Sequence, residues 1–385
     1  MHRPSIIWSI LWTVCLVSLF KCDPLTKQEN TQRLSSCGLK TTSKVWQGRN
    51  ASQSEAPWSV YLLYHTEEHS AEVCTGTVIS SRHILTATHC FADMDLGGWK
   101  EKLKYDKKNC KDGHYVIEDK SLLEKVHVKS DDKYIARSPE RVTFLNGCDV
   151  KNVKDLNEAR KVYEDVAIID LYEDLNFSNM IQMACVSSDK DDHKADTTLD
   201  YFGFGLNPKI PNSQTGVLRH ETIKVEQNNR GYEQPRSFVA KNADGKTIAC
   251  VGDSGGGSMV KIAGRTTVAG VLAQTSCANP AQRQGDQAAE LYSSVAYYYE
   301  TICKMTGICK AADYDTHHQG YVRKPKPIRT TPAPKITILD ENNNPIDPAI
   351  IHQQQQVYQN QNSGNAKKYG FVIVLMSFLC SFGRY

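Results

Sequence analysis

The sequence predicts a secreted domain of the all-β class over residues 45–310, and three features of the chain lead to this prediction. The chain begins with a short apolar leader, and its cysteines are even in number once the two terminal segments are set aside. Two apolar runs of strand type lie beside His89 and Asp165. A glycine-rich stretch, CVGDSGGG, surrounds Ser254 at residues 250–257.

Residues 1–22 have the pattern of a secretory signal peptide. His2 and Arg3 precede an apolar run at residues 6–20, which is too short for a comfortable membrane span. Cleavage near Cys22 would place the remaining chain in an oxidising compartment, where disulfides persist.

The cysteines agree with this location. Of the 13 in the chain, Cys15 and Cys22 belong to the leader and Cys380 is close to the C-terminus, which leaves an even set of 10 and predicts a disulfide framework. Asn50 and Asn176 each begin an Asn-x-Ser motif and are candidate glycosylation sites, although so short a motif also occurs by chance.

Charge and the C-terminal part limit the partners. With 46 Lys and Arg against 43 Asp and Glu, the net charge is only +3, which gives no reason to expect a nucleic acid. Residues 311–369 are rich in proline and then in glutamine and asparagine, so they predict a disordered stalk. The apolar tail at 370–385 follows small residues at 362–364, the pattern of a GPI-anchor signal. An untethered secreted protein stays open as the alternative.

His89, Asp165 and Ser254 are the residue types that nucleophilic catalysis by a serine requires. A serine hydroxyl is a weak nucleophile until a histidine takes its proton and an acid orients that histidine. His89 lies at the end of HILTATHC, and Asp165 precedes the apolar part of EDVAIIDL, where burial is expected. His83 is interpreted as a surface or satisfied core histidine, and Asp170 as an ordinary acid at a strand end.

The motifs TATHC, DVAII and GDSGG, in this order, resemble the signatures of the chymotrypsin-like (trypsin family) serine proteases over about residues 45–305. The resemblance implies two packed six-stranded antiparallel β-barrels with a C-terminal helix. It implies His89 as general base, Asp165 as the acid that orients it and Ser254 as nucleophile. The backbone N–H groups of Gly252 and Ser254 would form the oxyanion hole.

The stretch G-x-S-x-G by itself also fits the nucleophile turn of α/β-hydrolases. Those enzymes carry their histidine after the serine and the acid. Every histidine after Ser254 lies in the predicted stalk, so this reading is rejected.

The resemblance also implies a zymogen. Residues 23–44 would form a pro-segment, and cleavage after Lys44 would create an α-ammonium group at Val45 that pairs with the carboxylate of Asp253. The pocket described below is not built for lysine, so another protease is expected to make the cut. The family's disulfides imply three pairs, of which the last would tether the pro-segment: Cys74–Cys90, Cys250–Cys277 and Cys37–Cys185.

The chain departs from the family in a long charged insertion at about residues 92–160, which resembles insertions in a divergent nematode branch. It is interpreted as a solvated surface loop, with a substrate-selecting flap as the alternative. Cys110 and Cys148 lie in it and are candidates to pair. The partners of Cys303 and Cys309 stay open.

The specificity pocket departs as well. Ile248 is expected at its floor, where the trypsin type has an aspartate. Ala273, Gln274 and Thr275 stand at the wall, and Thr275 would narrow the entrance. Glu290 is a candidate to project from the opposite wall. These residues predict an apolar or aromatic side chain before the scissile bond, with Lys or Arg as a second class if Glu290 points inward.

The sequence therefore predicts a secreted serine endopeptidase, with no cofactor and no metal site. Its expected partners are a protein or peptide substrate, an activating protease and a protein inhibitor, with a membrane reached only through the GPI signal. The alternative is a protease-like fold that acts as a binding or adaptor module with weak or no turnover.

Overall fold

The computed structural model describes most of residues 24–320. The described ranges are 24–39, 50–65, 71–95, 98–100, 106–130, 133–137, 139–148, 164–207, 213–227, 236–242, 249–275, 277 and 289–320. The predicted signal peptide, the predicted activation site at Lys44 and Val45, Ile248, which is expected at the pocket floor, and everything after residue 320 lie outside these ranges.

The larger of two main sheets has the strand order β6-β7-β10-β11-β3-β2-β1-β8-β9 and is antiparallel throughout. β9 is the last strand in this order and β10 is the third. Only residues 138–140 connect them in the sequence. Its strands are β1 (Ser59–His65), β2 (Ala71–Val78), β3 (His83–Thr86), β6 (Cys110–Lys111), β7 (His114–Ile117), β8 (Val126–Ser130), β9 (Lys133–Arg137), β10 (Arg141–Phe144) and β11 (Ala167–Asp170).

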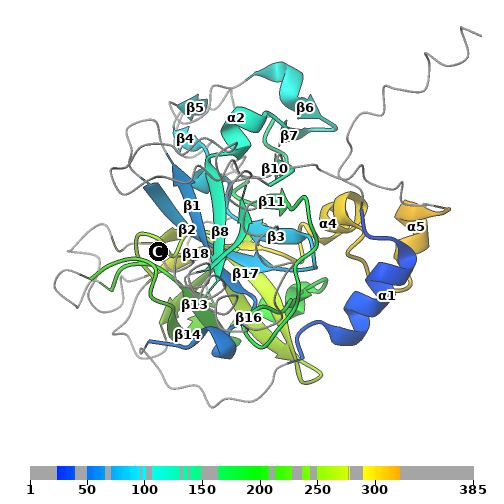
Figure 1. Cartoon of the computed structure of the whole chain (residues 1–385). Helices are drawn as coiled ribbons and strands as arrows, with labels where there is room; N and C mark the ends of the chain where they lie inside the picture. Colours follow the sequence, from blue (N-terminus) through cyan, green and yellow to red (C-terminus); the bar gives the residue numbers. More distant parts are fainter. Residues whose placement is uncertain are drawn as a thin grey trace, which may run out of the picture. The chain divides into compact units, whose positions relative to one another are not determined.

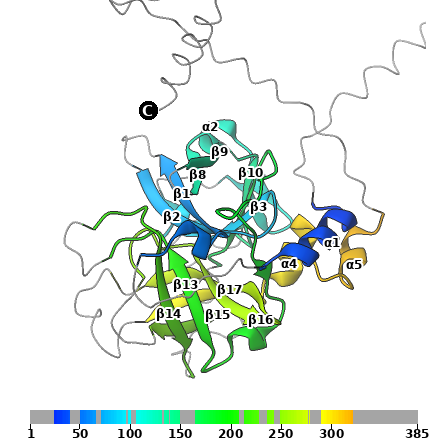
Figure 2. The ribbon, with the colours of Figure 1, turned by 60° about the horizontal axis from the view of Figure 1, so that its bottom comes forward.

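The second sheet closes into a barrel. Its order is β12-β17-β16-β13-β14-β15-β18, and β18 also pairs with β17, so six antiparallel strands form a ring that β12 joins in parallel. Figure 2 shows this barrel below the first sheet. Its strands are β12 (Cys185–Val186), β13 (Thr198–Gly203), β14 (Arg219–Val225), β15 (Ser237–Asn242), β16 (Gly257–Ile262), β17 (Arg265–Thr275) and β18 (Glu290–Ser294).

The expected all-β class is confirmed, because the described chain is mostly antiparallel β-structure with the helix α4 (Tyr299–Thr306) near its end. One of the two expected six-stranded barrels is the closed ring, whereas the other sheet has nine strands. The insertion at 92–160 is more than a surface loop. Besides small elements, it supplies β6, β7, β8, β9 and β10 of the larger sheet, and apolar side chains of β7, β8 and β10 are buried in the core. The small elements are β4 (Asp93–Asp95), β5 (Gly98–Lys100), the 3-10 turn η4 (Lys107–Asn109) and α2 (Lys120–Leu123).

Three helices from the two ends of the described chain lie together at one side of the sheets, as Figure 1 shows. They are α1 (Lys27–Ser36), α4 and α5 (Tyr314–His318). α1 begins with a capping box between Thr26 and Glu29, and such boxes satisfy backbone donors at a helix start. The described fold thus continues beyond the boundary expected at residue 310.

Residues before and within α1 are bound to the C-terminal segment by buried hydrogen bonds. The N–H of Leu25 donates to the carbonyl of Thr306 (2.7 Å), and the hydroxyl of Tyr314 donates to the carbonyl of Leu25 (2.7 Å). The Asn30 amide donates to the carbonyl of Cys309 (2.9 Å) and accepts from its N–H (3.3 Å). The part of the expected pro-segment that the structure describes is therefore an ordered element of the fold.

Five disulfides connect all ten cysteines of the described residues. Three are the pairs that the family resemblance implied, Cys37–Cys185, Cys74–Cys90 and Cys250–Cys277. The other two are Cys110–Cys148, within the insertion, and Cys303–Cys309, which closes a short loop after α4. Among the described residues, no helix has the length and apolar character needed to cross a membrane.

Asn30→Ala should destabilise the protein by about 1–3 kcal/mol, because it leaves both backbone groups of buried Cys309 without their partner. The measurement is urea unfolding of the full chain. Ser35→Ala, an exposed change on the same helix, is the control and should change the free energy of unfolding by less than about 0.5 kcal/mol. Equal stability of the two variants would contradict the docking of α1.

Candidate active site

Two antiparallel strands bring His89 and Asp165 together. β3 pairs with β11 so that Thr86 stands opposite Ala167. His89 lies just past the end of β3, in the 3-10 turn η3 (Thr88–Cys90), and Asp165 lies just before β11. Since the strands run in opposite directions, the two residues arrive at the same end of the sheet.

The Asp165 carboxylate binds His89 twice. One oxygen accepts from the His89 backbone N–H (2.9 Å), and the other lies 2.6 Å from the ring atom Nδ1. A carboxylate can only accept, so Nδ1 carries a proton, and in the neutral ring the lone pair is then on Nε2. The side chain of Asp165 is 2% exposed, whereas that of His89 is 29% exposed. The ring is therefore held by a buried carboxylate and is itself accessible to solvent.

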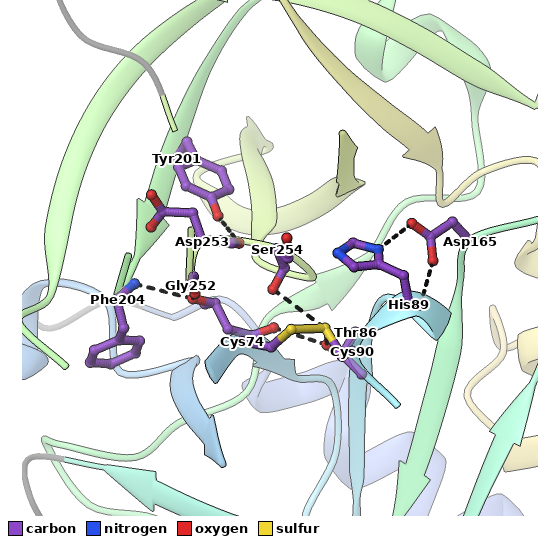
Figure 3. Close-up of a disulfide and its surroundings, with 11 residues drawn as sticks. Cys74, Thr86, His89, Cys90, Asp165, Tyr201, Phe204, Gly252, Asp253 and Ser254 are labelled. Atoms are coloured by element: carbon purple, nitrogen blue, oxygen red, sulfur yellow. Dashed lines mark hydrogen bonds and ion pairs between the residues drawn. A yellow bond between two sulfur atoms is a disulfide. The ribbon is translucent and has the colours of Figure 1, made fainter. Parts of the chain in front are cut away.

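Ser254 lies beside the imidazole ring, on the side away from Asp165 (Figure 3). Its carbonyl accepts from the N–H of Thr75 on β2 (2.8 Å), which ties the serine turn of the barrel to the other sheet. The next residue, Gly255, has φ +81°, and a Cβ there would overlap Thr86. The glycine cluster after the serine therefore allows the turn to approach β2 and β3.

Thr75 also binds Gly252, two residues before the serine. Its hydroxyl donates to the carbonyl of Gly252 (2.9 Å) and accepts from the N–H of Phe204 (3.1 Å). Gly252 has φ +96° and packs against Gly205 so tightly that a Cβ would approach that backbone to 3.0 Å. The two residues expected to line an oxyanion hole, Gly252 and Ser254, thus share one anchoring threonine.

Asp253 has a buried carboxylate that receives only backbone hydrogen bonds. Its oxygens accept from the N–H groups of Gly205 (2.7 Å) and Cys250 (2.8 Å), and no salt bridge between described residues involves it. Burial raises the pKa of Asp253 to about 7. A Cβ on Gly203 or on Gly205 would overlap this carboxylate, so the sequence FGFG at residues 202–205 is shaped around it.

Thr75, Gly203 and Gly205 were not singled out from the sequence. The two glycines alternate with aromatic residues at the end of β13, which is a detectable signal of close backbone approach. Thr75 gives no such signal, because a threonine in a strand is ordinary.

His83 and Asp170 form a separate buried cluster. Ser80 Oγ lies 2.6 Å from His83 Nδ1, and Asp170 lies 3.3 Å from His83 Nε2 and 3.0 Å from the guanidinium of Arg141. Burial alone would raise the pKa of Asp170, but Arg141 and His83 lower it to about 2. His83 is thus a satisfied core histidine, whereas Asp170 is more than an ordinary strand-end acid.

The described pocket residues are brought together. Ala273, Gln274 and Thr275 form the end of β17, and Thr275 stands opposite Glu290 of β18. The Glu290 side chain turns inward and is buried, where it accepts from the N–H of Ala249 (2.7 Å).

Two further groups of side chains lie close enough together to suggest metal ligands, but both contain disulfides. They are Cys74 with His89 and Cys90, and Cys303 with Cys309 and His318. Disulfide sulfurs are not the thiolates that bind metals. The two candidate glycosylation residues, Asn50 and Asn176, are both exposed.

Comparisons with known proteins identify similar chains. The model of the nematode trypsin-6-like family matches residues 6–309. The serine protease grass of Drosophila melanogaster is 24% identical over 250 residues, covering 62% of this chain and 62% of grass. The Spaetzle-processing enzyme of the same species is 25% identical over 253 residues, covering 59% of this chain and 57% of that enzyme. Chymotrypsin-C of Rattus norvegicus is 25% identical over 230 residues, covering 56% of this chain and 72% of the rat enzyme.

Asp253→Asn should change how the stability of the uncut protein depends on pH. A folded pKa near 7, above the ordinary 3.8, stabilises the fold below about pH 4, and this stabilisation is lost as the pH rises through 7. The difference in free energy of unfolding between the Asn variant and wild type should therefore shift by about 2–3 kcal/mol in favour of the variant between pH 5 and pH 8.

Urea unfolding at the two pH values measures this difference. Asp196→Asn, at an exposed carboxylate paired with Lys224, is the control and should follow the wild-type pH dependence. The same wild-type dependence in Asp253→Asn would show that the Asp253 carboxyl has an ordinary pKa.

Proposed function

Because the chain belongs to the nematode trypsin-6-like family, and its relatives named above include serine proteases, we propose that it is a secreted serine endopeptidase. The observation that supports this most strongly is the double hydrogen bond between His89 and Asp165, with Ser254 on the other side of the ring. The chain spans 62% and 57% of the two Drosophila relatives, so the proposal concerns the protease domain that they share.

In the proposed reaction, Ser254 Oγ attacks the carbonyl carbon of the scissile peptide bond while His89 Nε2 takes the hydroxyl proton. Asp165 keeps the imidazole in the required tautomer and stabilises the imidazolium. The N–H groups of Gly252 and Ser254 bind the oxyanion. His89 then protonates the leaving amine, and a water molecule hydrolyses the acyl-enzyme by the same proton path, which regenerates Ser254.

We further propose that the protein is made as a zymogen and is cut by another protease after Lys44. The state of Asp253 supports this, because a buried carboxylate without a cation is unfavourable and the α-ammonium of Val45 would supply one. Asp253 precedes the nucleophile, so its pairing would position the Gly252–Ser254 turn. The disulfide Cys37–Cys185 would keep the cut segment attached.

One observation favours a second candidate, a binding or adaptor module with weak or no turnover. The two walls of the expected pocket are joined by a hydrogen bond from Thr275 to the carbonyl of Ala249 (2.5 Å), which restricts access. A fluorophosphonate probe separates the candidates, because it reacts with an activated serine and leaves an inert one unlabelled.

Ser254→Ala and His89→Ala should each abolish fluorophosphonate labelling and reduce peptide hydrolysis by at least about 10⁴-fold, since the three residues act as a unit. Asp165→Asn should lower the rate by about 10⁴-fold, because it favours the wrong imidazole tautomer. Circular dichroism verifies folding, and Ser121→Ala, an exposed change on α2, should keep full labelling. Wild-type turnover by Ser254→Ala would exclude the mechanism.

Lys44→Gln should keep the protein inactive when the activating protease is added, because no α-ammonium forms at Val45. Activity on a peptide substrate and N-terminal sequencing of the product are the measurements. Lys40→Gln removes a nearby lysine and should activate normally. Full activity of the uncut Lys44→Gln protein would refute the activation step.

A further inference from the structure

Two backbone segments flank Ser254 on the side of the barrel. One is 249–253, which leads directly into the serine. The other is the end of β17, where Leu272 exchanges hydrogen bonds with the serine turn: its carbonyl accepts from Gly255 (2.9 Å) and its N–H donates to Gly256 (2.9 Å). The disulfide Cys250–Cys277 joins the two segments. A substrate side chain next to the attacked carbonyl must enter between them.

Both polar groups of Ala249 are bound by the opposite strands. Its carbonyl accepts from the Thr275 hydroxyl (2.5 Å), and its N–H donates to Glu290 (2.7 Å). Ala249 is 2% exposed. The first segment is thus held at hydrogen-bond distance from both β17 and β18.

Other buried side chains surround Glu290. Tyr292 is fully buried and donates its hydroxyl to Glu290 (2.6 Å). Glu221 of β14 also lies there, 6% exposed, bound to the Asn242 amide (2.9 Å) and hydrogen bonded to Glu290. Two carboxyl groups can share a hydrogen bond only if at least one is protonated, and burial raises the pKa of both Glu221 and Glu290. Asp253 and Tyr201 are the other titratable groups that act on this cluster.

We propose that the primary specificity pocket is shallow and accepts a small uncharged side chain, such as that of glycine, alanine or serine, before the scissile bond. Thr275 and Glu290 are the residues that determine this. The inference rests on the proposed protease function and replaces the expectation of an apolar or aromatic side chain with that of a small uncharged one.

The same contacts exclude lysine and arginine as the second class. Glu290 is only 1% exposed, and its two oxygens already accept from Ala249 and Tyr292. Because Glu290 is covered by its partners, a substrate cation could reach its carboxyl only by displacing one of them, which leaves a buried donor unpaired.

The test uses the full chain after cleavage and four peptides that differ only in the residue before the scissile bond: Ala, Ser, Phe and Lys. For wild type, kcat/KM for Ala and Ser should exceed that for Phe and Lys by at least about tenfold. Thr275→Gly removes both the methyl group and the hydroxyl at the entrance, and should raise the ratio of Phe to Ala by at least about tenfold. Thr275→Ser keeps the hydroxyl that binds Ala249 and should keep the wild-type ratio.

A wild-type preference for Phe or Lys, or an unchanged ratio in Thr275→Gly, would overturn the proposal. Fluorophosphonate labelling of the same samples separates this result from failure of the proposed function: a labelled protein that prefers Phe refutes only the shallow pocket. If the serine is not labelled, binding of indole, a neutral flat aromatic molecule that needs a deep apolar pocket, still decides. Absence of binding to wild type at millimolar concentration supports the shallow pocket, and binding there refutes it.

Discussion

The contact of Thr75 with the serine turn is the interaction on which the candidate active site depends. One residue of β2 binds Ser254 through its N–H, Gly252 through its hydroxyl and Thr86 through its carbonyl, so it joins the barrel to the sheet that carries His89. Cys74, its neighbour, is bonded to Cys90, the neighbour of His89. The nucleophile and the base come from different sheets, and this single strand segment fixes the distance between them.

Three buried carboxyl groups near the candidate active site differ in the partners that stabilise them. Asp170 has a cationic partner in Arg141 and stays ionised, with a pKa of about 2. Asp165 is bound twice by His89. Asp253 has only N–H donors, and its pKa is raised to about 7. A buried charge without a partner is unfavourable, so a new cationic partner would stabilise the ionised form of Asp253.

Much of this site could be predicted from the sequence, because short motifs reflect local requirements. HILTATHC and EDVAIIDL mark the paired strand ends that bring His89 and Asp165 together, and GDSGG marks the turn that only glycines allow. The interpretation of residues 92–160 as a solvated surface loop was wrong where this segment forms β7, β8 and β10, because the burial of these strands depends on partners distant in sequence. The contacts of Thr275 and Glu290 with Ala249 also depend on the closure of the barrel, which no local pattern encodes.

The docking of α1 has a consequence for what the mature protein consists of. A polypeptide that began at Val45 would carry a free thiol at Cys185 and would lack Glu29, one of the two carboxylates that bind Arg82, whose side chain is only 4% exposed. Thr266, near the start of β17, would lose its backbone hydrogen bond to Gly38, and the hydroxyl of Tyr314 would lose the Leu25 carbonyl to which it donates. If the proposed cleavage after Lys44 takes place, the cut protein would therefore keep residues 24–39 as part of its fold, joined to the rest by Cys37–Cys185.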